Sequence, residues 1–273
     1  MKILHAGRHI LTFNRPLIMG ILNVTPDSFS DGGCYASVTS AVAQAEAMLL
    51  AGADILDIGG ESTRPGAAAV PVDEECARVL PILKALANHG VPLSLDTQKT
   101  HVMQRVLAET DIDLINDISA LEDAHALTLI AQSMVGVCLM HKKGAPFNMQ
   151  TAPHYTNVVT EVTDYLSQRV TACLDAGIAQ QRLCVDVGFG FGKTVAHNLD
   201  LLRHLADICP EMPMLVGLSR KSMLGALCNE PNPRERLGAS VAAALIAVQN
   251  GANIVRVHDV VPTRQALQVW AAL

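Results

Sequence analysis

Aromatic residues are scarce in this sequence, and it has no long apolar run. Only 3% of the 273 residues are Phe, Trp or Tyr, although half are apolar, so the core must consist of Ala, Val, Ile and Leu. A parallel sheet whose strands are buried on both faces has such an aliphatic composition. The longest small and apolar stretch, residues 238–248, is far shorter than the roughly 20 residues that a membrane-spanning helix requires.

Basic stripes, paired cysteines and a signal sequence are also missing. The net charge of −6 and the absence of a basic run argue against nucleic acid or an anionic membrane as a partner. The seven cysteines stand singly and form no C-x-x-C pair, which argues for reduced thiols and against a zinc cluster. Residues 1–16 lack the continuous apolar core of a signal peptide. We therefore expect a cytoplasmic protein.

A recurring pattern organises the chain: an Ala-rich helix, a glycine, and a short apolar strand that ends in a polar residue. This pattern predicts helices over 37–51, 73–89, 155–176 and 234–250, and strands over 54–58, 92–96, 183–186 and 253–257. Each helix is followed by a glycine, the residue that best adopts the left-handed conformation at a helix C-terminus: Gly52, Gly90, Gly177 and Gly251.

Further strands are predicted over 17–22, 113–116, 135–140 and 214–218, and further helices over 99–109, 123–132, 198–208 and 263–271. Eight alternating strand–helix units predict an α/β protein with a single (β/α)8 TIM barrel over residues 17–273. A doubly wound open sheet is the structural alternative. Residues 1–16 are predicted to form a short N-terminal β-hairpin, with its turn at Ala6–Gly7, that plugs the bottom of the barrel.

Polar residues follow the predicted strands, where the active site of a (β/α)8 barrel lies. These residues are Asn23, Glu61, Ser62, Thr63, Arg64, Asp96, Asn116, Met140, His141, Asp186, Ser219, Arg220, Lys221, Arg256 and His258. A buried carboxylate without a donor is costly, so such a ring of polar groups favours function over packing.

The polar groups divide into two chemical classes. Asp96, Asn116 and Asp186 can read the donor edge of a planar heterocycle, whereas the donor groups of Lys221, Arg256 and His258 suit phosphate. Asn23 with nearby Asp27 and Asp31 can support a Mg²⁺ ion held mainly by phosphate oxygens. The sequence therefore predicts a phosphorylated heterocyclic substrate.

Seven segments of the chain resemble the signature motifs of the dihydropteroate synthase family. They are residues 22–33, 57–66, 94–97, 115–117, 186–193, 217–222 and 256–259, and the resemblance runs in register from about Arg15 to Asp259. The family condenses p-aminobenzoate with 6-hydroxymethyl-7,8-dihydropterin diphosphate, giving 7,8-dihydropteroate and diphosphate in folate biosynthesis. The resemblance implies this transferase activity, Mg²⁺ as cofactor, a homodimer, and sulfonamides as mimics of aminobenzoate.

The resemblance also implies roles for single residues. Asp96, Asn116, Asp186 and Lys221 would hold the pterin, with Met140 and Phe191 near its faces. Asn23, Arg256 and His258 would hold the diphosphate together with Mg²⁺, and Asn23 would be the metal ligand. Thr63 and Arg64 would reach toward the leaving group and the amine, Phe29 and Pro65 would wall the aminobenzoate ring, and Ser222 would meet its carboxylate.

The catalytic roles implied by the resemblance fall to Asp31, Arg64, Lys221, Arg256 and His258. The expected reaction is a dissociative substitution at the pterin methylene, in which Asp31 stabilises positive charge on that carbon. An arylamine is neutral and nucleophilic at neutral pH, so no strong general base is required. Two alternatives stay open: a pterin-binding methyl-tetrahydrofolate methyltransferase, which has no use for a diphosphate clamp, and a non-catalytic relative that binds pterin without turnover.

Overall fold

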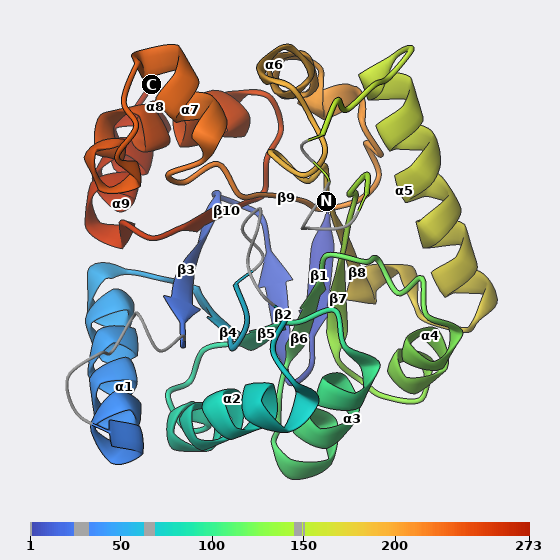
Figure 1. Ribbon diagram of the computed structural model, residues 1–273, viewed down its shortest axis with the longest axis vertical. Helices are drawn as coiled ribbons and strands as arrows, with labels where there is room; N and C mark the ends of the chain where they lie inside the picture. Colours follow the sequence, from blue (N-terminus) through green and yellow to red (C-terminus); the bar gives the residue numbers. More distant parts are fainter. Residues whose placement is uncertain (1, 25–32, 63–68, 145–148, 150) are drawn as a thin grey trace.

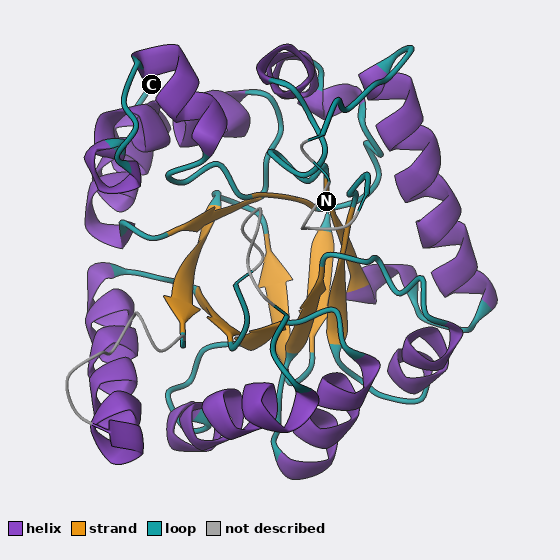
Figure 2. Ribbon diagram, viewed as in Figure 1, coloured by secondary structure: helices purple, strands orange, loops and turns teal. Residues whose placement is uncertain are grey.

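The centre of the molecule is a closed barrel of eight parallel strands. The structure is a computed structural model that describes residues 2–24, 33–62, 69–144, 149 and 151–273. The barrel strands follow one another in chain order, and the last of them pairs with the first. Strands lie in the middle and helices around the outside (Figures 1 and 2). The predicted barrel is confirmed, and the open-sheet alternative is wrong.

The barrel strands are short and almost wholly buried, as the aliphatic composition predicts. They are β3 (Leu17–Asn23), β4 (Ile55–Gly59), β5 (Leu93–Asp96), β6 (Leu114–Asp117), β7 (Gly136–Met140), β8 (Leu183–Asp186), β9 (Met214–Val216) and β10 (Ile254–Val257). Every predicted strand overlaps one of these. Their outward faces pack against the helices in one large apolar core.

The helices cover the outside of the barrel (Figure 1). They are α1 (Gly33–Ala51), α2 (Val72–Leu86), α3 (Thr100–Glu109), α4 (Ala124–Ala131), α5 (Val158–Asp175), α6 (Val195–Arg203), α7 (Ser222–Cys228), α8 (Leu237–Gln249) and α9 (Val260–Ala271), with 3-10 turns at η2 (Gln180–Arg182), η3 (Leu205–Asp207) and η4 (Pro233–Glu235). In the part of the chain that the structure describes, no helix is both long and apolar enough to cross a membrane.

Two predicted helices are interrupted by 3-10 turns, and one helix was not predicted. The helix predicted over 234–250 is divided, because the Asn232 side chain caps the 3-10 turn η4 and α8 begins only at Leu237. The guanidinium of Arg236 donates to the carbonyls of Glu230 and Pro231, which holds the chain at this break. The helix predicted over 198–208 likewise ends at Arg203 and continues as η3, and α7 was not predicted as a separate element.

The predicted glycine stops are confirmed within two residues of the ends of α1, α5 and α8, whereas α2 ends at Leu86, four residues before Gly90. All four glycines have positive φ angles. Their φ angles are +98° at Gly52, +73° at Gly90, +88° at Gly177 and +102° at Gly251. These values lie in the region that L side chains rarely adopt, so each glycine lets the chain turn sharply from helix toward strand.

The N-terminal residues form the predicted hairpin, β1 (Ile3–Ala6) paired with β2 (His9–Thr12), with its turn at Gly7 and Arg8, one residue later than predicted, because Ala6 still pairs with His9. Leu4 and Ala6 are fully buried and belong to the apolar cluster inside the barrel. The backbone N–H and Nε of Arg8 both donate to the buried carboxylate of Asp113, which precedes β6. The hairpin therefore plugs the end of the barrel where the strands begin.

The barrel interior changes from apolar to polar along the strands. The apolar layer beside the hairpin is formed by Leu17, Met19, Ile55, Leu114, Cys138, Cys184, Leu215 and Ile254. Side chains two residues apart on a strand point to the same face. The next inward positions therefore bring polar groups into the upper interior: Asp57, Asn116, Asp186 and Arg256. Because these inward positions lie two residues further along each strand, an apolar layer at the bottom of the barrel is followed directly by a polar layer.

Candidate active site

Among four neighbouring strands, three carry polar side chains near their ends, and the strand pairing places these side chains in one row. Asn23 of β3 pairs with Gly59 of β4, Gly59 pairs with Asp96 of β5, and Asp96 pairs with Asn116 of β6. A Cβ atom built on Gly59 would lie 3.5 Å from Cβ of Asp96 and 3.8 Å from Oδ1 of Asn23. The missing side chain at Gly59 therefore leaves room between an amide and a carboxylate.

A fully buried carboxylate, Asp57, lies one step below this row. It accepts hydrogen bonds from Oγ of Ser94 at 2.5 Å, Nδ2 of Asn116 at 3.1 Å and Nε of Arg256 at 2.5 Å. Site prediction from the sequence missed Asp57, although a carboxylate in the middle of an apolar strand was a visible signal. Its three partners come from three different strands, so Asp57 ties β5, β6 and β10 together inside the barrel.

Arg256 crosses the interior between two carboxylates. Besides its Nε bond to Asp57, its Nη2 donates to Oδ2 of Asp96 at 2.5 Å. Burial works to lower the pKa of Arg256, but the charges of Asp57 and Asp96 outweigh it and raise that pKa above its usual value. The guanidinium therefore stays charged, and the structure brings it together with the residues predicted to read the pterin.

Asp96 combines a perturbed titration with an unsatisfied oxygen. Burial raises the pKa of its carboxyl to about 7, although Arg256 opposes the rise. Its Oδ1 is buried and has no hydrogen-bond partner among the described residues. A buried acceptor without a donor is costly, so the site is arranged for a ligand that supplies N–H or O–H groups at this oxygen.

Asp186 and an apolar cluster form the other side of the site. Oδ1 of Asp186 accepts the backbone N–H of Gly188 at 2.8 Å, while burial raises the pKa of the carboxyl. Met140 and Phe191 pack together with Ile118 and Met149 in a small separate core. The carboxylate of Asp186 and the apolar surface of this cluster together suit an aromatic heterocycle.

Lys221 lies over this apolar surface, with its Nζ 4.3 Å from the ring centroid of Phe191. A cation over an aromatic face is attracted by the ring quadrupole. Ser222, the next residue, is exposed and begins α7. Lys221 therefore joins the predicted pterin residues, while Ser222 stands at the rim.

The loop after β9 and the segment after β10 are bonded to each other. Oγ of Ser219 lies 3.0 Å from Nδ1 of His258, and the backbone N–H of His258 donates to the same oxygen at 3.3 Å. Arg220 donates from Nε and Nη2 to the two carboxylate oxygens of Asp259 at 3.0 and 2.6 Å. These contacts tie the imidazole of His258 to the loop that carries Lys221.

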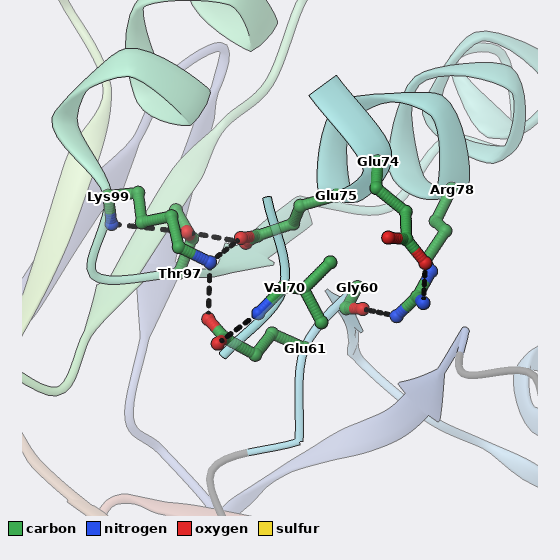
Figure 3. A network of polar contacts seen from close by, with 8 residues as sticks. All are labelled: Gly60, Glu61, Val70, Glu74, Glu75, Arg78, Thr97 and Lys99. Carbon is green, nitrogen blue, oxygen red and sulfur yellow. Dashed lines mark hydrogen bonds and ion pairs between the residues drawn. The ribbon is translucent and has the colours of Figure 1, made fainter. Parts of the chain in front are cut away.

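A second polar network lies at the base of the segment that follows β4 (Figure 3). Nζ of Lys99 lies 2.6 Å from a carboxylate oxygen of Glu61 and 2.6 Å from one of Glu75, which is fully buried. The other oxygen of Glu61 accepts the backbone N–H of Val70 at 3.0 Å, and the other oxygen of Glu75 accepts the hydroxyl of Thr97. The network thus connects both ends of residues 61–70 to the residue after Asp96.

Ten of the predicted site residues lie in the described part of the chain: Asn23, Asp96, Asn116, Met140, Asp186, Phe191, Lys221, Ser222, Arg256 and His258. Five lie outside the described residues: Phe29, Asp31, Thr63, Arg64 and Pro65. Asp27, considered beside Asn23, also lies outside them. In the described ranges, no three His, Cys, Asp or Glu side chains come together in a group that could hold a metal ion.

Comparisons with known proteins identify the family of the chain. Residues 19–258 match the family model described as pterin binding enzyme. A dihydropteroate synthase of Neisseria meningitidis serogroup C is 54% identical, over 98% of this chain and 96% of that protein. The chain belongs to the dihydropteroate synthase family. The predicted family, the transferase class and the place in folate biosynthesis are confirmed by these matches.

Solved structures of the family superpose closely on this one. The Burkholderia cenocepacia dihydropteroate synthase complexed with 7,8-dihydropteroate has a TM-score of 0.91 at 50% identity, covering 99% of this chain and 96% of that chain. The Xanthomonas albilineans dihydropteroate synthase with 4-aminobenzoic acid has a TM-score of 0.92 at 49% identity, covering 99% and 97%. Both of these dihydropteroate synthases therefore bind small molecules on a barrel like this one.

Proposed function

We propose that the polar ring at the strand ends condenses 6-hydroxymethyl-7,8-dihydropterin diphosphate with p-aminobenzoate. The observation that carries the proposal is the buried Arg256 between Asp57 and Asp96, with an oxygen of Asp96 left for a ligand. The bound ligands of the Burkholderia and Xanthomonas relatives, product and aminobenzoate, support the same substrates here.

The pterin is bound by acceptors on one edge and by apolar contacts on its faces. Asp96, Asn116 and Asp186 meet its N–H groups, and Lys221 donates to its acceptor side. Met140 and Phe191 pack near the faces of the ring, consistent with their shared apolar cluster. Both buried carboxylates have raised pKa values because of burial, so donors from the ligand stabilise their charged forms.

The diphosphate is held by Asn23, Arg256 and His258. The bonds of Arg256 to Asp57 and Asp96 use two of the five N–H donors of a guanidinium. Asn23 would also be a ligand of Mg²⁺, together with diphosphate oxygens and with Asp27 or Asp31. The oxygen of Asn23 beside the space at Gly59 fits an ion that takes few protein ligands and prefers oxygen. When bound, Mg²⁺ supplies positive charge to the leaving diphosphate.

In the reaction, the C–O bond to diphosphate breaks with its electron pair on the departing oxygen, and the amine nitrogen bonds to the methylene carbon. The amine proton then leaves to solvent. Arg256 and His258 stabilise the developing charge on the diphosphate, and Asp31 stabilises the cationic pterin. Thr63 and Arg64 reach toward the leaving group, Phe29 and Pro65 wall the aminobenzoate ring, and the hydroxyl of Ser222 meets its carboxylate.

The protein is further proposed to be a cytoplasmic homodimer. Exposed large apolar side chains are concentrated on α7, α8 and α9: Leu227, Leu237, Ile246, Val261 and Val269. Apolar side chains gathered in one region of a surface are typical of an interface. The partner on this surface would be a second copy of the chain.

The proposed reaction is tested by diphosphate release from the purified protein with the pterin diphosphate and Mg²⁺, with and without p-aminobenzoate. We expect release that depends on aminobenzoate and is matched by formation of dihydropteroate. Binding of the pterin diphosphate without aminobenzoate-dependent release would instead identify a non-catalytic relative. Methyl transfer from methyl-tetrahydrofolate would identify the methyltransferase alternative.

A further inference from the structure

A lysine outside the ring just described is almost completely buried beside it. Lys193 is 3% exposed and lies in the loop that runs from the end of β8 to α6, here called the β8 loop. Its Nζ lies 3.0 Å from the carbonyl oxygen of Gly188 and 3.0 Å from that of Phe191. It also lies 2.9 Å from Nδ1 of His141, which follows β7. One ammonium group therefore gathers acceptors from two loops at the mouth of the barrel.

The backbone of the β8 loop is shaped to bring these carbonyls to one point. Gly188, Gly190 and Gly192 alternate along it with φ angles of +67°, +81° and +64°. A Cβ on Gly188 would lie 1.9 Å from the carbonyl oxygen of His141, and one on Gly192 would lie 2.2 Å from that of Lys143. Close approach to the β7 loop therefore requires glycine at both positions.

The loop that Lys193 holds also carries predicted pterin contacts. The N–H of Gly188 donates to Asp186, and Gly188 itself accepts from Lys193. Phe191, whose carbonyl accepts from Lys193, packs against Met140. Moving the ammonium would therefore displace both the carboxylate of Asp186 and the ring of Phe191.

The charge states of the pair suit this arrangement. Burial and the nearby charge of Lys193 together lower the pKa of His141 to about 3, so the imidazole is neutral and Nδ1 can accept a hydrogen bond. Burial lowers the pKa of Lys193 to about 7, while Asp186 opposes the shift and Lys221 and Lys143 add to it. The ammonium form, which donates three hydrogen bonds, is thus sensitive to pH near neutrality.

We propose that Lys193 is a positioning residue of the pterin site, which ties the β8 loop to His141 and thereby fixes Asp186 and Phe191. This inference rests on the proposed function, because it takes the pterin diphosphate as the ligand. Lys193 acts through the loop and need not touch the substrate. Its loss therefore weakens binding of the pterin more than it slows turnover at saturation.

The test is calorimetric binding of the pterin diphosphate in the absence of aminobenzoate, for wild type, Lys193→Met and Lys193→Arg. We expect Lys193→Met to weaken binding on the order of tenfold or more, as the loss of hydrogen bonds to a charged group does. Lys193→Arg, which keeps the charge and the donors, should recover most of the affinity. If Lys193→Met does not fold, Lys193→Gln carries the same comparison.

Lys142→Met is the control, because Lys142 is a partly buried lysine next to His141 in the chain that donates to Gln98 and not to the β8 loop. Its affinity should stay near that of wild type. In steady-state kinetics, Lys193→Met should raise KM for the pterin diphosphate more than it lowers kcat. A purely structural role would lower the melting temperature and leave KM unchanged.

The pH dependence gives a second readout. Wild-type affinity should fall as pH rises through about 7, where Lys193 loses its proton, and Lys193→Met should lack this decline. The titratable groups that face Lys193 are His141 and Lys143 after β7, Asp186 at the end of β8, His197 in α6 and Lys221 after β9. Wild-type affinity in folded Lys193→Met, or an equal loss in Lys142→Met, would overturn the proposal. If the wild-type protein bound the pterin diphosphate but did not turn it over, only the proposed function would be contradicted. The affinities of the variants could still be compared.

Discussion

Asp57 illustrates how one buried side chain can organise a site without facing the substrate. It holds Arg256 and Asn116, one residue from each of the two chemical classes predicted for the site. Asp57→Asn keeps the shape but removes the charge, and we expect kcat/KM to fall on the order of 100-fold, as for a lost bond to a charged partner.

Ser94→Ala is the control for this prediction, since it removes the hydroxyl donor to Asp57 and leaves Arg256 in place. We expect a much smaller loss from it in the same steady-state assay. Equal kcat/KM values for Asp57→Asn and wild type would show that Asp96 alone suffices to hold Arg256.

The titration of Asp96 predicts that affinity for the pterin diphosphate rises with pH, whereas the titration of Lys193 predicts that it falls. Because burial raises the pKa of Asp96 to about 7, its carboxyl is largely protonated below that pH and accepts poorly from the pterin. Affinity for the pterin diphosphate should therefore rise between about pH 5 and 7, by up to about tenfold per pH unit.

Calorimetry of Asp96→Asn across the same pH range checks this assignment. The variant should bind more weakly, lose the rising limb and keep the decline above pH 7 assigned to Lys193. A rising limb of unchanged size in Asp96→Asn would assign the titration to another group, such as the substrate itself.

At the scale of elements, the Lys99 network connects α2, the end of β5 and the base of residues 61–70 (Figure 3). Lys99→Met would leave the fully buried Glu75 without its cation. Breaking a buried pair costs about 3–5 kcal/mol, and we expect about 3 kcal/mol or less because Lys99 is 21% exposed.

Thermal or urea unfolding measures the loss of unfolding free energy in Lys99→Met, with Lys84→Met as the matched control. Lys84 pairs with Glu109 on the surface, so its removal should change the free energy of unfolding little. Equal stabilities of the two variants would mean that Glu75 finds another partner when Lys99 is lost. We also expect Lys99→Met to raise KM for aminobenzoate, because Thr63, Arg64 and Pro65 lie between the two bonded ends of this segment.

For the whole molecule, the proposed dimer gives a direct test. Ile246 is 45% exposed on α8, and Ile246→Lys places a charge on the proposed interface. We expect a shift from dimer to monomer in sedimentation velocity at micromolar concentration, whereas Ile10→Lys on the N-terminal hairpin should leave the dimer intact. A dimer that persists in Ile246→Lys would place the interface elsewhere.

The alternation of helices, glycine stops and aliphatic strands determined the barrel from the sequence. These signals are local: a helix needs its stop within a few residues, and a parallel strand carries its burial in its own composition. The break before α8 could not be found in this way, because Arg236 also donates to the carbonyl of Arg220, which lies 16 positions away and is brought near only by the folded chain.

The sequence by itself also determined which strand ends carry polar side chains and, through the motif resemblance, the family. Only the tertiary structure decided that Arg256 lies between Asp57 and Asp96, and that Lys193 joins two loops. Asp57 and Arg256 are 199 positions apart in the chain. The physical reason is that a charge inside a protein must find its partner in space, and closure of the barrel, which pairs β10 with β3, creates that proximity.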